Sequence, residues 1–442
     1  MKTIKHTLYT FTLLLLITSC SKDDGPAGPL TPEPENPVAQ NTAPELADQS
    51  FTVAENITDT TVIGTITATD TEEDALTYSL TTNSNDLFVL TETGELSLAT
   101  GKLLNYDVAQ THTLTVEVTD GTNTTTANIS IAITNTVDVY VVGGHYIGGH
   151  ISATLWKNGI PTPLSTKSSN ANSIYVSEDG DVYVTGWENN GTNKVATLWK
   201  NGEASYLSSK RSAGNDVYVS KGKVYVAGYN YNKNTKEATL WTNGSPATLA
   251  GTPPGSTEAF SVCVYNDNVY VSGKDYAPTL WVNTLPRKLD NNTGRVNEIF
   301  VVSKNKIIAV GGRGTTEAGS VATFWRGNES WNTQTQQEIQ LGTSYGEIKS
   351  ISYSKGNFYM IGYEKNTIGG NIPMLWENDM ATVFSNDVSI KLRAISVFND
   401  DVYIVGKKGN SATLWKNKEA IPLGYLEGEN QNSTAFDVFV KL

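Results

Sequence analysis

The chain has 442 residues, a formal net charge of −13 and a pI near 4.9. This length predicts two or more domains, or one large repeat domain. Tyr, Trp, Val and Thr are frequent, Gly numbers 38, and segments with helical spacing are missing, so an all-β fold is expected. The acidic charge repels phosphate backbones and argues against a nucleic-acid partner. The two cysteines, Cys20 and Cys263, support no disulfide framework.

The first twenty residues have the form of a secretory signal. Lys2 and Lys5 precede an apolar run from Leu8 to Ile17, which is too short to span a bilayer. The end of this segment, "ITSC", resembles the lipobox of bacterial lipoproteins, in which cleavage leaves a cysteine for lipid attachment. The resemblance implies that residues 1–20 are a lipoprotein signal peptide and that Cys20 anchors the protein to a membrane. The alternative is an ordinary secretory signal with an incidental cysteine.

Residues 21–40 read "SKDDGPAGPLTPEPENPVAQ" and are rich in Pro, Gly and acidic residues. They have no apolar periodicity, which predicts a disordered, extended tether. Their first residues, "SKDDG", resemble the Lys-acidic-acidic signal that directs lipoproteins of the Bacteroidetes to the outer face of the outer membrane. The resemblance implies a lipid-anchored protein exposed at the cell surface.

Residues 41–137 alternate short β-type runs with turns, which predicts a Greek-key β-sandwich. The segments "NTAPEL", "AEN", "ATDTEEDALTYSL", "GELSLATGKLLNYD" and "VEVTDG" follow one another as in a cadherin repeat. This part of the chain, about a fifth of the whole, therefore resembles the cadherin family. In that family, acidic residues at the ends of the sandwich bind calcium.

The resemblance implies a calcium site, because Ca²⁺ takes six to eight oxygen ligands. The sequence departs from the family in three places: "LNYD" replaces Leu-Asp-Arg-Glu, "QNTAPE" and "TNTVD" replace the acidic linkers, and no second cadherin repeat follows. The alternative interpretation is a spacer whose acidic residues are solvated turn residues. The positions that match the family's calcium ligands are Glu55, Asp70, Glu72, Asp107 and Asp120.

Residues 138–442 contain a sevenfold repeat. The phrase "ATLWKNG" and its variants occur seven times, with tryptophans 39 to 51 residues apart, and each copy follows a run such as "DVYVTGW". A third run, such as "NDVYVS", and a fourth, such as "SYLSS", complete units of four short strands. This spacing is typical of a propeller blade, so a seven-bladed β-propeller is expected. It resembles bacterial extracellular propellers generally but matches no characterised propeller family.

The two ends of the repeat region predict how the ring closes. The first unit, residues 138–165, lacks the leading run, and the C-terminal "TAFDVFVKL" supplies one without a unit after it. Residues 435–441 are therefore expected to form the fourth strand of the first blade. The tryptophans are expected to pack between blades, and "KNG" is expected to form a tight turn with positive φ.

The loops after the "VYVxG" runs differ most between units and are expected to gather on one face of the ring. Their aromatic side chains suit stacking on sugar rings, and the alternative, which the sequence favours, is that they only pad the bases of the loops. His145 and His150 raise the possibility of a metal or a general base, but the glycines around them argue against a rigid site. The candidate ligand-binding residues are Tyr146, Trp187, Tyr229, Tyr231, Tyr276 and Tyr363.

The expected function is that of a non-enzymatic, surface-anchored binding or adhesion lipoprotein whose propeller binds a glycan or protein. The sequence contains no nucleophile motif and no Gly-rich phosphate loop. The alternative is a polysaccharide lyase or glycosidase, in which Asp and Glu residues pair across the ring. Convergent carboxylates in a deep central cleft favour the enzyme, and a flat aromatic and polar face favours binding.

Overall fold

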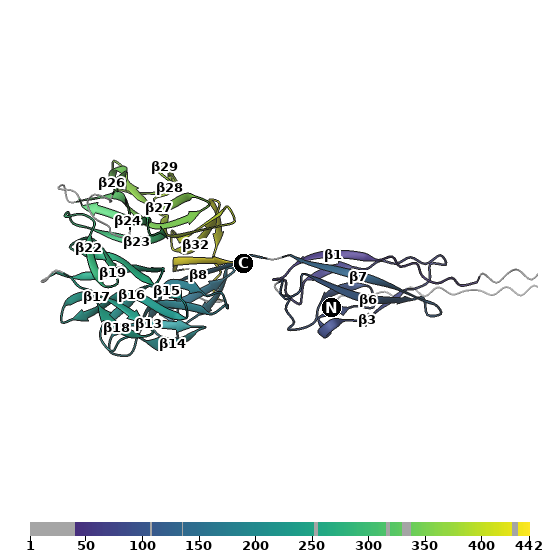
Figure 1. Cartoon of the computed structure of the whole chain (residues 1–442). Coiled ribbons are helices and arrows are strands. Elements are labelled where there is room, and N and C mark those ends of the chain that lie inside the picture. Colours follow the sequence, from purple (N-terminus) through teal and green to yellow (C-terminus); the bar gives the residue numbers. More distant parts are fainter. Residues whose placement is uncertain are drawn as a thin grey trace, which may run out of the picture. The chain divides into compact units, whose positions relative to one another are not determined.

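The structure is a computed structural model that describes residues 40–106, 108–134, 136–251, 255–314, 319–328, 337–426 and 432–442. The predicted signal peptide with Cys20, and the predicted tether up to residue 39, lie outside the described residues. The chain divides into two compact units, Met1–Thr134 and Asn135–Leu442 (Figure 1). Nearly all regular structure in the described part is β-strand, which confirms the all-β prediction; the exception is a short 3-10 helix, Ser84–Asp86. Within that part, no helix has the length and apolar character needed to cross a bilayer.

The first unit is built from two sheets. The strand orders are β1-β7-β6-β3 and β2-β5-β4, with β1 parallel to β7 and the other pairs antiparallel. The strands are β1 (Gln49–Ala54), β2 (Val62–Thr65), β3 (Thr77–Thr82), β4 (Phe88–Leu90), β5 (Glu95–Leu98), β6 (Thr111–Thr119) and β7 (Thr124–Thr134).

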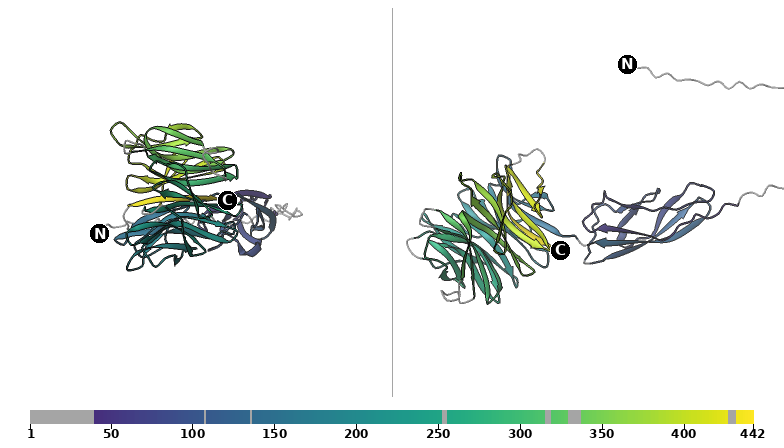
Figure 2. Two further views of the ribbon diagram at one scale, coloured as in Figure 1. Left: turned by 60° about the vertical axis from the view of Figure 1, so that its left-hand side comes forward. Right: turned by 90° about the horizontal axis from the view of Figure 1, so that it is seen from above.

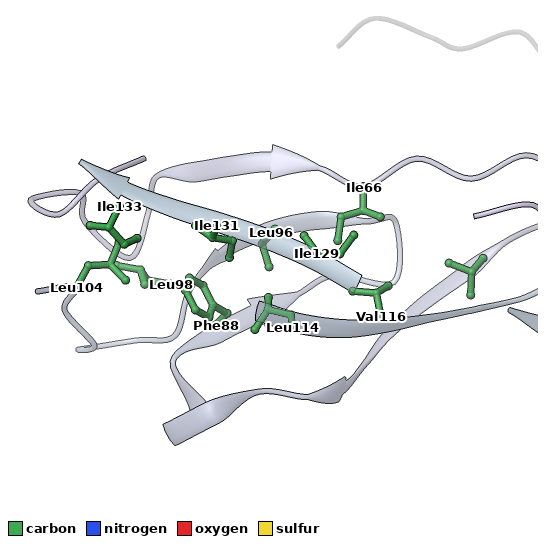
Figure 3. Packing of buried hydrophobic residues seen from close by; sticks show 11 residues of the cluster. Ile66, Phe88, Leu96, Leu98, Leu104, Leu114, Val116, Ile129, Ile131 and Ile133 are labelled. Atoms are coloured by element: carbon green, nitrogen blue, oxygen red, sulfur yellow. The ribbon is translucent and has the colours of Figure 1, made fainter. Parts of the chain in front are cut away.

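The core of the first unit lies between these sheets (Figure 3). Strand β6 reads "THTLTVEVT", and its alternation places Leu114, Val116 and Val118 on the buried face. They pack with Leu96 and Phe88 of the other sheet and with the isoleucines of β7. Because the side-chain period of a strand is two, this pattern fixes which face each strand buries.

The second unit consists of sheets that repeat one design. The first sheet has the order β10-β9-β8-β34, and most of the others have four consecutive strands each. The strands of the first three sheets are β8 (Asp138–Ile147), β9 (His150–Lys157), β10 (Ile160–Pro163), β34 (Ser433–Lys441), β11 (Ser169–Val176), β12 (Val182–Asn189), β13 (Lys194–Lys200), β14 (Glu203–Tyr206), β15 (Ser212–Ser220), β16 (Lys223–Asn232), β17 (Thr235–Thr242) and β18 (Ser245–Thr248).

The remaining sheets are β19–β22, β23–β29 and β30–β33. Their strands are β19 (Thr257–Tyr265), β20 (Asn268–Asp275), β21 (Ala277–Val282), β22 (Leu285–Lys288), β23 (Gly294–Ser303), β24 (Lys306–Gly314), β25 (Ser320–Gly327), β26 (Gln337–Ser354), β27 (Asn357–Lys365), β28 (Asn371–Glu377), β29 (Met380–Val383), β30 (Lys391–Phe398), β31 (Asp401–Lys408), β32 (Ser411–Lys416) and β33 (Glu419–Pro422).

One strand departs from the expected pattern of short, separate strands. Strand β26 has 18 residues; its first part pairs with β25, and residues from Gly346 onward pair with β27. The chain stays extended between the last strand of one unit and the first strand of the next. Two units of the repeat therefore share one seven-stranded sheet.

The C-terminal strand completes the first sheet, as the sequence predicts. Strand β34 pairs antiparallel with β8, from Ser433 opposite His145 to Lys441 opposite Asp138. It also contacts β30 of the last sheet and β11 of the second sheet. Figure 2 shows the sheets of this unit following one another from teal through green to yellow. Strand β34, which belongs to the first sheet, contacts strands of the last sheet.

The repeated tryptophans lie on the third strand of each unit and pack against the preceding sheet. Trp199 packs against Val142 of the first sheet, and Trp156 of the first sheet packs against Val405 of the last sheet. Six of the seven side chains are fully buried, and the seventh, Trp415, is 2% exposed. This confirms the expected packing role of the tryptophans.

The asparagine of the repeated "KNG" turn is required both for its backbone conformation and for the hydrogen bonds of its side chain. Asn201 has a φ of 51° and Gly202 a φ of 86°, which confirms a tight turn with two left-handed residues. The Asn201 side chain accepts a hydrogen bond from the N–H of Val182 at 2.8 Å and donates one to Asp181 at 2.7 Å. The same pair of bonds recurs at Asn158 and Asn417. The asparagine side chain thus joins each of these turns to the start of the neighbouring strand by two hydrogen bonds.

Candidate functional site

Three of the predicted calcium ligands lie close to the start of the described chain. The hydroxyl of Thr42 donates to Glu72 at 2.8 Å, and the Asn41 amide donates to Asp120 at 3.2 Å. The Oδ1 atom of Asp70 accepts the N–H of Glu72 at 3.0 Å. Residues 41–42 thus connect the loops that carry these acidic residues.

Unpartnered oxygen atoms occur at this same end of the sandwich. Asp70 Oδ2 and Asn41 Oδ1 are buried and have no hydrogen-bond partner among the described residues. The N–H groups of Asn123 and Thr122 hold the pKa of Asp120 below its ordinary value, so this carboxylate stays ionised. Buried oxygen acceptors without donors beside an ionised carboxylate are chemically suited to a hard cation.

Another predicted ligand, Glu55, lies at the opposite end of β7. Asp120 precedes this strand, whereas the N–H of Glu55 donates to the carbonyl of Thr134, its last residue. Glu55 Oε2 accepts the N–H of Tyr106 at 2.9 Å. Asp107 lies outside the described residues. In the described ranges, no three His, Cys, Asp or Glu side chains are arranged to hold a metal, so the acidic residues do not form one complete site there.

A pocket in the second unit is lined by residues at a β-bulge that recurs in its sheets. We call β34, β11, β15, β19, β23, β26 and β30 the inner strands. Each has a register shift at the same place, such as that between Ala171 and Ser173 in β11. The glycine of "VYVxG" faces the bulge, and a Cβ on Gly186 would lie 1.9 Å from the carbonyl oxygen of Asn170. The bulge explains why this glycine recurs.

All seven inner strands contribute two residues each to one pocket of about 110 Å³, which we call the central pocket. The first residue of each pair is the bulged residue, and the second follows it on the strand. The bulged residues are Asn172, Asn215, Phe260, Asn297, Lys349, Arg393 and Phe436. The residues that follow them are Ser173, Asp216, Ser261, Glu298, Ser350, Ala394 and Asp437.

Three carboxyl groups of the second set join neighbouring inner strands around the central pocket. Each accepts the backbone N–H of a residue on the next inner strand. The bonds run from Val262 to Asp216 at 2.7 Å, from Ile351 to Glu298 at 2.8 Å and from Ile174 to Asp437 at 3.0 Å. The last of these bonds joins the C-terminal strand β34 to β11.

Burial dominates the ionisation of these carboxyl groups. It raises the pKa of Glu298 to about 8 and that of Asp437 to about 7, and it raises the pKa of Asp216. The backbone hydrogen bonds act in the opposite direction, while the charge of Asp216 raises the pKa of the other two groups. Glu298 therefore retains its proton at neutral pH.

Positive charge gathers on one side of the central pocket. Arg295 forms a two-pronged ion pair with Glu347, and Lys349 Nζ lies 2.7 Å from Glu347 Oε2. Although burial alone raises it, these cations lower the pKa of Glu347 to about 2. The guanidinium of Arg393 lies 5.3 Å from the ring centroid of Phe436. Burial and the neighbouring Arg295 and Arg393 lower the pKa of Lys349.

The predicted aromatic residues lie at the same edge of the sheets as the bulges. Asn170 pairs with Trp187, Ala213 with Tyr229, and Glu347 with Tyr363, so the ends of the second strands adjoin the starts of the inner strands. The loops expected to form one face are therefore next to the bulged residues of the central pocket.

In three of these residues, one cationic side chain lies over the face of the aromatic ring. Lys194 lies 3.9 Å above Trp187, Lys236 lies 3.9 Å above Tyr229, and Arg211 lies 4.3 Å above Tyr231.

The other three aromatic residues have different environments. Tyr276 is 68% exposed, and Tyr146 is half-buried at the end of β8. Tyr363 lines a second pocket of about 230 Å³ that shares Lys349 and Arg393 with the central pocket. Only this member of the predicted set lies beside the central pocket's cations.

Sequence reasoning missed the residues of the central pocket. The available signal was the pair of letters before each inner apolar run: "NS", "ND", "FS", "NE", "KS", "RA" and "FD". These pairs vary and carry charge where the rest of the run repeats. His145, by contrast, is buried beside Trp156 and Tyr425, so its surroundings are those of a packed side chain.

Comparison with known proteins assigns a family likeness to the first unit. Residues 49–134 match the family model of the cadherin domain. The human mucin-like protocadherin EC1-2 is 21% identical, with 21% of this chain and 54% of that chain covered and a TM-score of 0.20. Human protocadherin-24 EC1-2 is 14% identical over 48% and 96% of the two chains, with a TM-score of 0.21. A nidogen/laminin complex is 6% identical over 70% and 99%, with a TM-score of 0.37. No curated protein matches the chain.

Proposed function

We propose that the protein is a surface-anchored binding or adhesion lipoprotein that uses its second unit to hold a glycan or protein ligand. The cadherin-domain match of residues 49–134 supports an adhesion or binding role. The "ITSC" and "SKDDG" segments support lipid attachment at Cys20 and exposure on the outer membrane. In this proposal the tether and the cadherin-like unit act as spacers.

We also infer that the second unit is a seven-bladed β-propeller closed by β34. Four observations support this inference: the sevenfold repeat, the pairing of β34 with β8, the packing of Trp156 on the last sheet, and the hydrogen bond from Ile174 to Asp437. A closed ring leaves no sheet face uncovered at either end of the repeat.

The observation that carries the binding role is the separation of repeated from variable residues. Tryptophan, the turn asparagine and the bulge glycine recur because packing and backbone geometry require them. The residues that differ between sheets converge on the central pocket and the loops beside it. A rigid repeat that presents varied side chains at one place is suited to ligand recognition.

The carboxyl groups of the central pocket favour the alternative of a polysaccharide-cleaving enzyme. Glu298 has the raised pKa of a general acid and shares the pocket with Asp216 and Asp437. However, each of the three accepts a backbone N–H from a neighbouring inner strand, which gives it a structural purpose. We therefore place binding first.

One experiment separates these two functions. The purified protein is applied to an array of glycans and cell-surface proteins, and bound glycans are analysed for shortened products. Retention of an intact ligand supports binding, and release of shorter chains supports the enzyme. If no array member is retained or cleaved, the binding proposal fails for the ligand classes that we name.

We propose further that the cadherin-like unit binds calcium weakly through Asp70, Glu72 and Asp120, with Asn41 beside them. The unpartnered oxygens of Asp70 and Asn41 support a calcium site at this end of the sandwich. Glu55 lies at the other end of the sandwich, and Asp107, which also matches a ligand position of the family, lies outside the described residues. Calorimetry with CaCl₂ is expected to give weak binding, because incomplete ligand sets leave the ion largely hydrated. Submicromolar affinity would contradict the expected weakness, and no heat would leave only the spacer role.

A further inference from the structure

Two cations, Arg295 and Lys349, contact the carboxylate of Glu347 beside the central pocket, in a chain whose net charge is −13. Both oxygens of Glu347 are engaged: Arg295 contacts both, and Lys349 contacts Oε2. The Glu347 side chain is only 2% exposed, so its carboxylate is bound by protein groups and not by solvent. Together with Arg393, the cluster has an excess of positive charge that Glu347 does not neutralise.

Arg393 is the cation with the fewest contacts. Within the described part of the chain it forms no ion pair, and its Nε is buried without a hydrogen-bond partner. A buried donor on a charged group costs free energy unless something accepts from it. The Phe436 ring beside the guanidinium supplies a π face but no oxygen. Because Nε itself is closed to solvent, an anionic ligand would bind at the terminal nitrogens of the guanidinium, which also have no hydrogen-bond partner among the described residues.

The second pocket lies beside Lys349 and Arg393 and offers space for the rest of an anionic ligand. It shares Lys349 and Arg393 with the central pocket and is also lined by Tyr363, Asn371 and Pro373. Its volume of about 230 Å³ is below the roughly 300 Å³ at which sites for drug-sized ligands begin, so it fits one small residue. Tyr363 and Pro373 offer apolar faces to ring C–H groups, and Asn371 offers an amide for hydroxyl groups.

We propose that the Lys349–Arg393 site binds the carboxylate of a hexuronate residue in an acidic glycan. The planar Arg393 guanidinium matches a planar carboxylate, and Lys349 adds a point charge on the same ligand group. The sugar ring lies in the second pocket against Tyr363. This inference rests on the proposed binding function and specifies the ligand class for it.

The test uses calorimetry on the full chain purified in mild detergent. The probes are trisaccharides of galacturonate, glucuronate and mannuronate, the corresponding neutral trisaccharides, and a glutamate tripeptide. We expect at least one uronate trisaccharide to bind about tenfold or more tightly than its neutral counterpart, a difference of about 1.4 kcal/mol. Its affinity should fall as salt is raised, because the attraction is between charges.

Arg393→Gln and Lys349→Gln should each weaken uronate binding about tenfold or more. Lys355→Gln is the matched control, since Lys355 lies in an exposed ion pair with Asp400. Tryptophan fluorescence verifies that each variant is folded, and the salt dependence of the unmodified chain provides a readout that needs no variant.

Equal affinity for uronate and neutral sugars, or no effect of Arg393→Gln in a folded variant, would overturn the inference. Tighter binding of the glutamate tripeptide would overturn it in favour of an acidic peptide. If no uronate binds while the array described above retains another ligand, the hexuronate site is wrong and the binding function stands. If neither experiment finds a ligand, both fail.

Discussion

Glu298, Asp216 and Asp437 each accept an N–H across a junction between inner strands, from a half-buried position at the wall of the central pocket. A neutral carboxyl group makes this bond without the cost of a buried charge. The three groups also face one another, and the cations Lys349 and Arg393 line the same pocket. Their protonation is therefore coupled to the stability of the second unit.

Stability of the second unit should fall as pH rises from about 4.5 to about 8. The pKa of Glu298 is about 8 in the folded chain against an ordinary 4.5, so the folded state holds a proton that the unfolded state releases in this window. Asp437, at about 7, acts with the same sign. The depressed pKa of Glu347, about 2, affects stability only below about 4.5.

Urea unfolding at pH 5 and pH 8 measures this effect. Tryptophan fluorescence isolates the second unit, because all nine tryptophans follow residue 135. Glu298→Gln removes the titrating group and should reduce the difference between the two pH values. The explanation fails if the unmodified chain is equally stable at both, or if Glu298→Gln leaves the difference unchanged.

Each tryptophan-bearing strand depends on the sheet before it. In an open array, the first sheet would have no predecessor, and its tryptophan would be exposed. Trp156 instead packs against the last sheet and donates a hydrogen bond to the carbonyl of Gly424 at 2.9 Å. The junction between the last and first sheets therefore resembles the internal junctions.

Trp156→Ala and Trp199→Ala should have similar effects. Each removes a fully buried indole from a junction between sheets, and the expected loss in the free energy of unfolding is about 3–5 kcal/mol. Trp199 is the matched control, because it lies at an internal junction. Denaturant unfolding followed by circular dichroism gives both values. A much smaller loss for Trp156→Ala would indicate an open array.

The repeated elements were predictable because their causes are local. The Asn-Gly turns, the buried tryptophans and the C-terminal strand are each indicated by a short sequence pattern at their own position. The merger of two expected strands in β26 was not predictable, because nothing in "LGTSYGEIKS" marks a continuous extended chain. The bulges were missed because pairing between strands defines them, and glycine opposite a bulge looks like any strand glycine.

The candidate site was only partly predictable for a similar reason. The edge that carries the aromatic loops follows from strand order, and Tyr363 lies there beside a pocket. Lys349 and Arg393 come from different inner strands, β26 and β30, whose side-by-side placement depends on the packing of whole sheets. In the first unit, the family motif located the acidic residues but not the unpartnered oxygen of Asn41.

For the whole molecule, the proposed lipid anchor at Cys20 would hold the binding site at a membrane. Cys20→Ser should abolish lipid labelling and release the protein from membranes, because one thiol carries the attachment in the proposed lipoprotein. Metabolic labelling with a fatty-acid analogue and fractionation of membranes measure both outcomes. Ser21→Ala is the control, since it changes a neighbouring residue and keeps the thiol. Unchanged membrane partition of Cys20→Ser would refute the anchor.

In the proposed propeller, β34 closes the ring and contributes Phe436 and Asp437 to the lining of the central pocket. Deleting residues 433–442 leaves β8 with unpaired backbone groups and uncovers apolar side chains of the first and last sheets. Deleting Leu442 alone removes an exposed residue and serves as the control. The decisive measurement is the thermal midpoint of the tryptophan fluorescence transition in the full chain. We predict a large drop, or no cooperative transition, for the ten-residue deletion and no change for the control; an unchanged midpoint in the ten-residue deletion would contradict a closed ring.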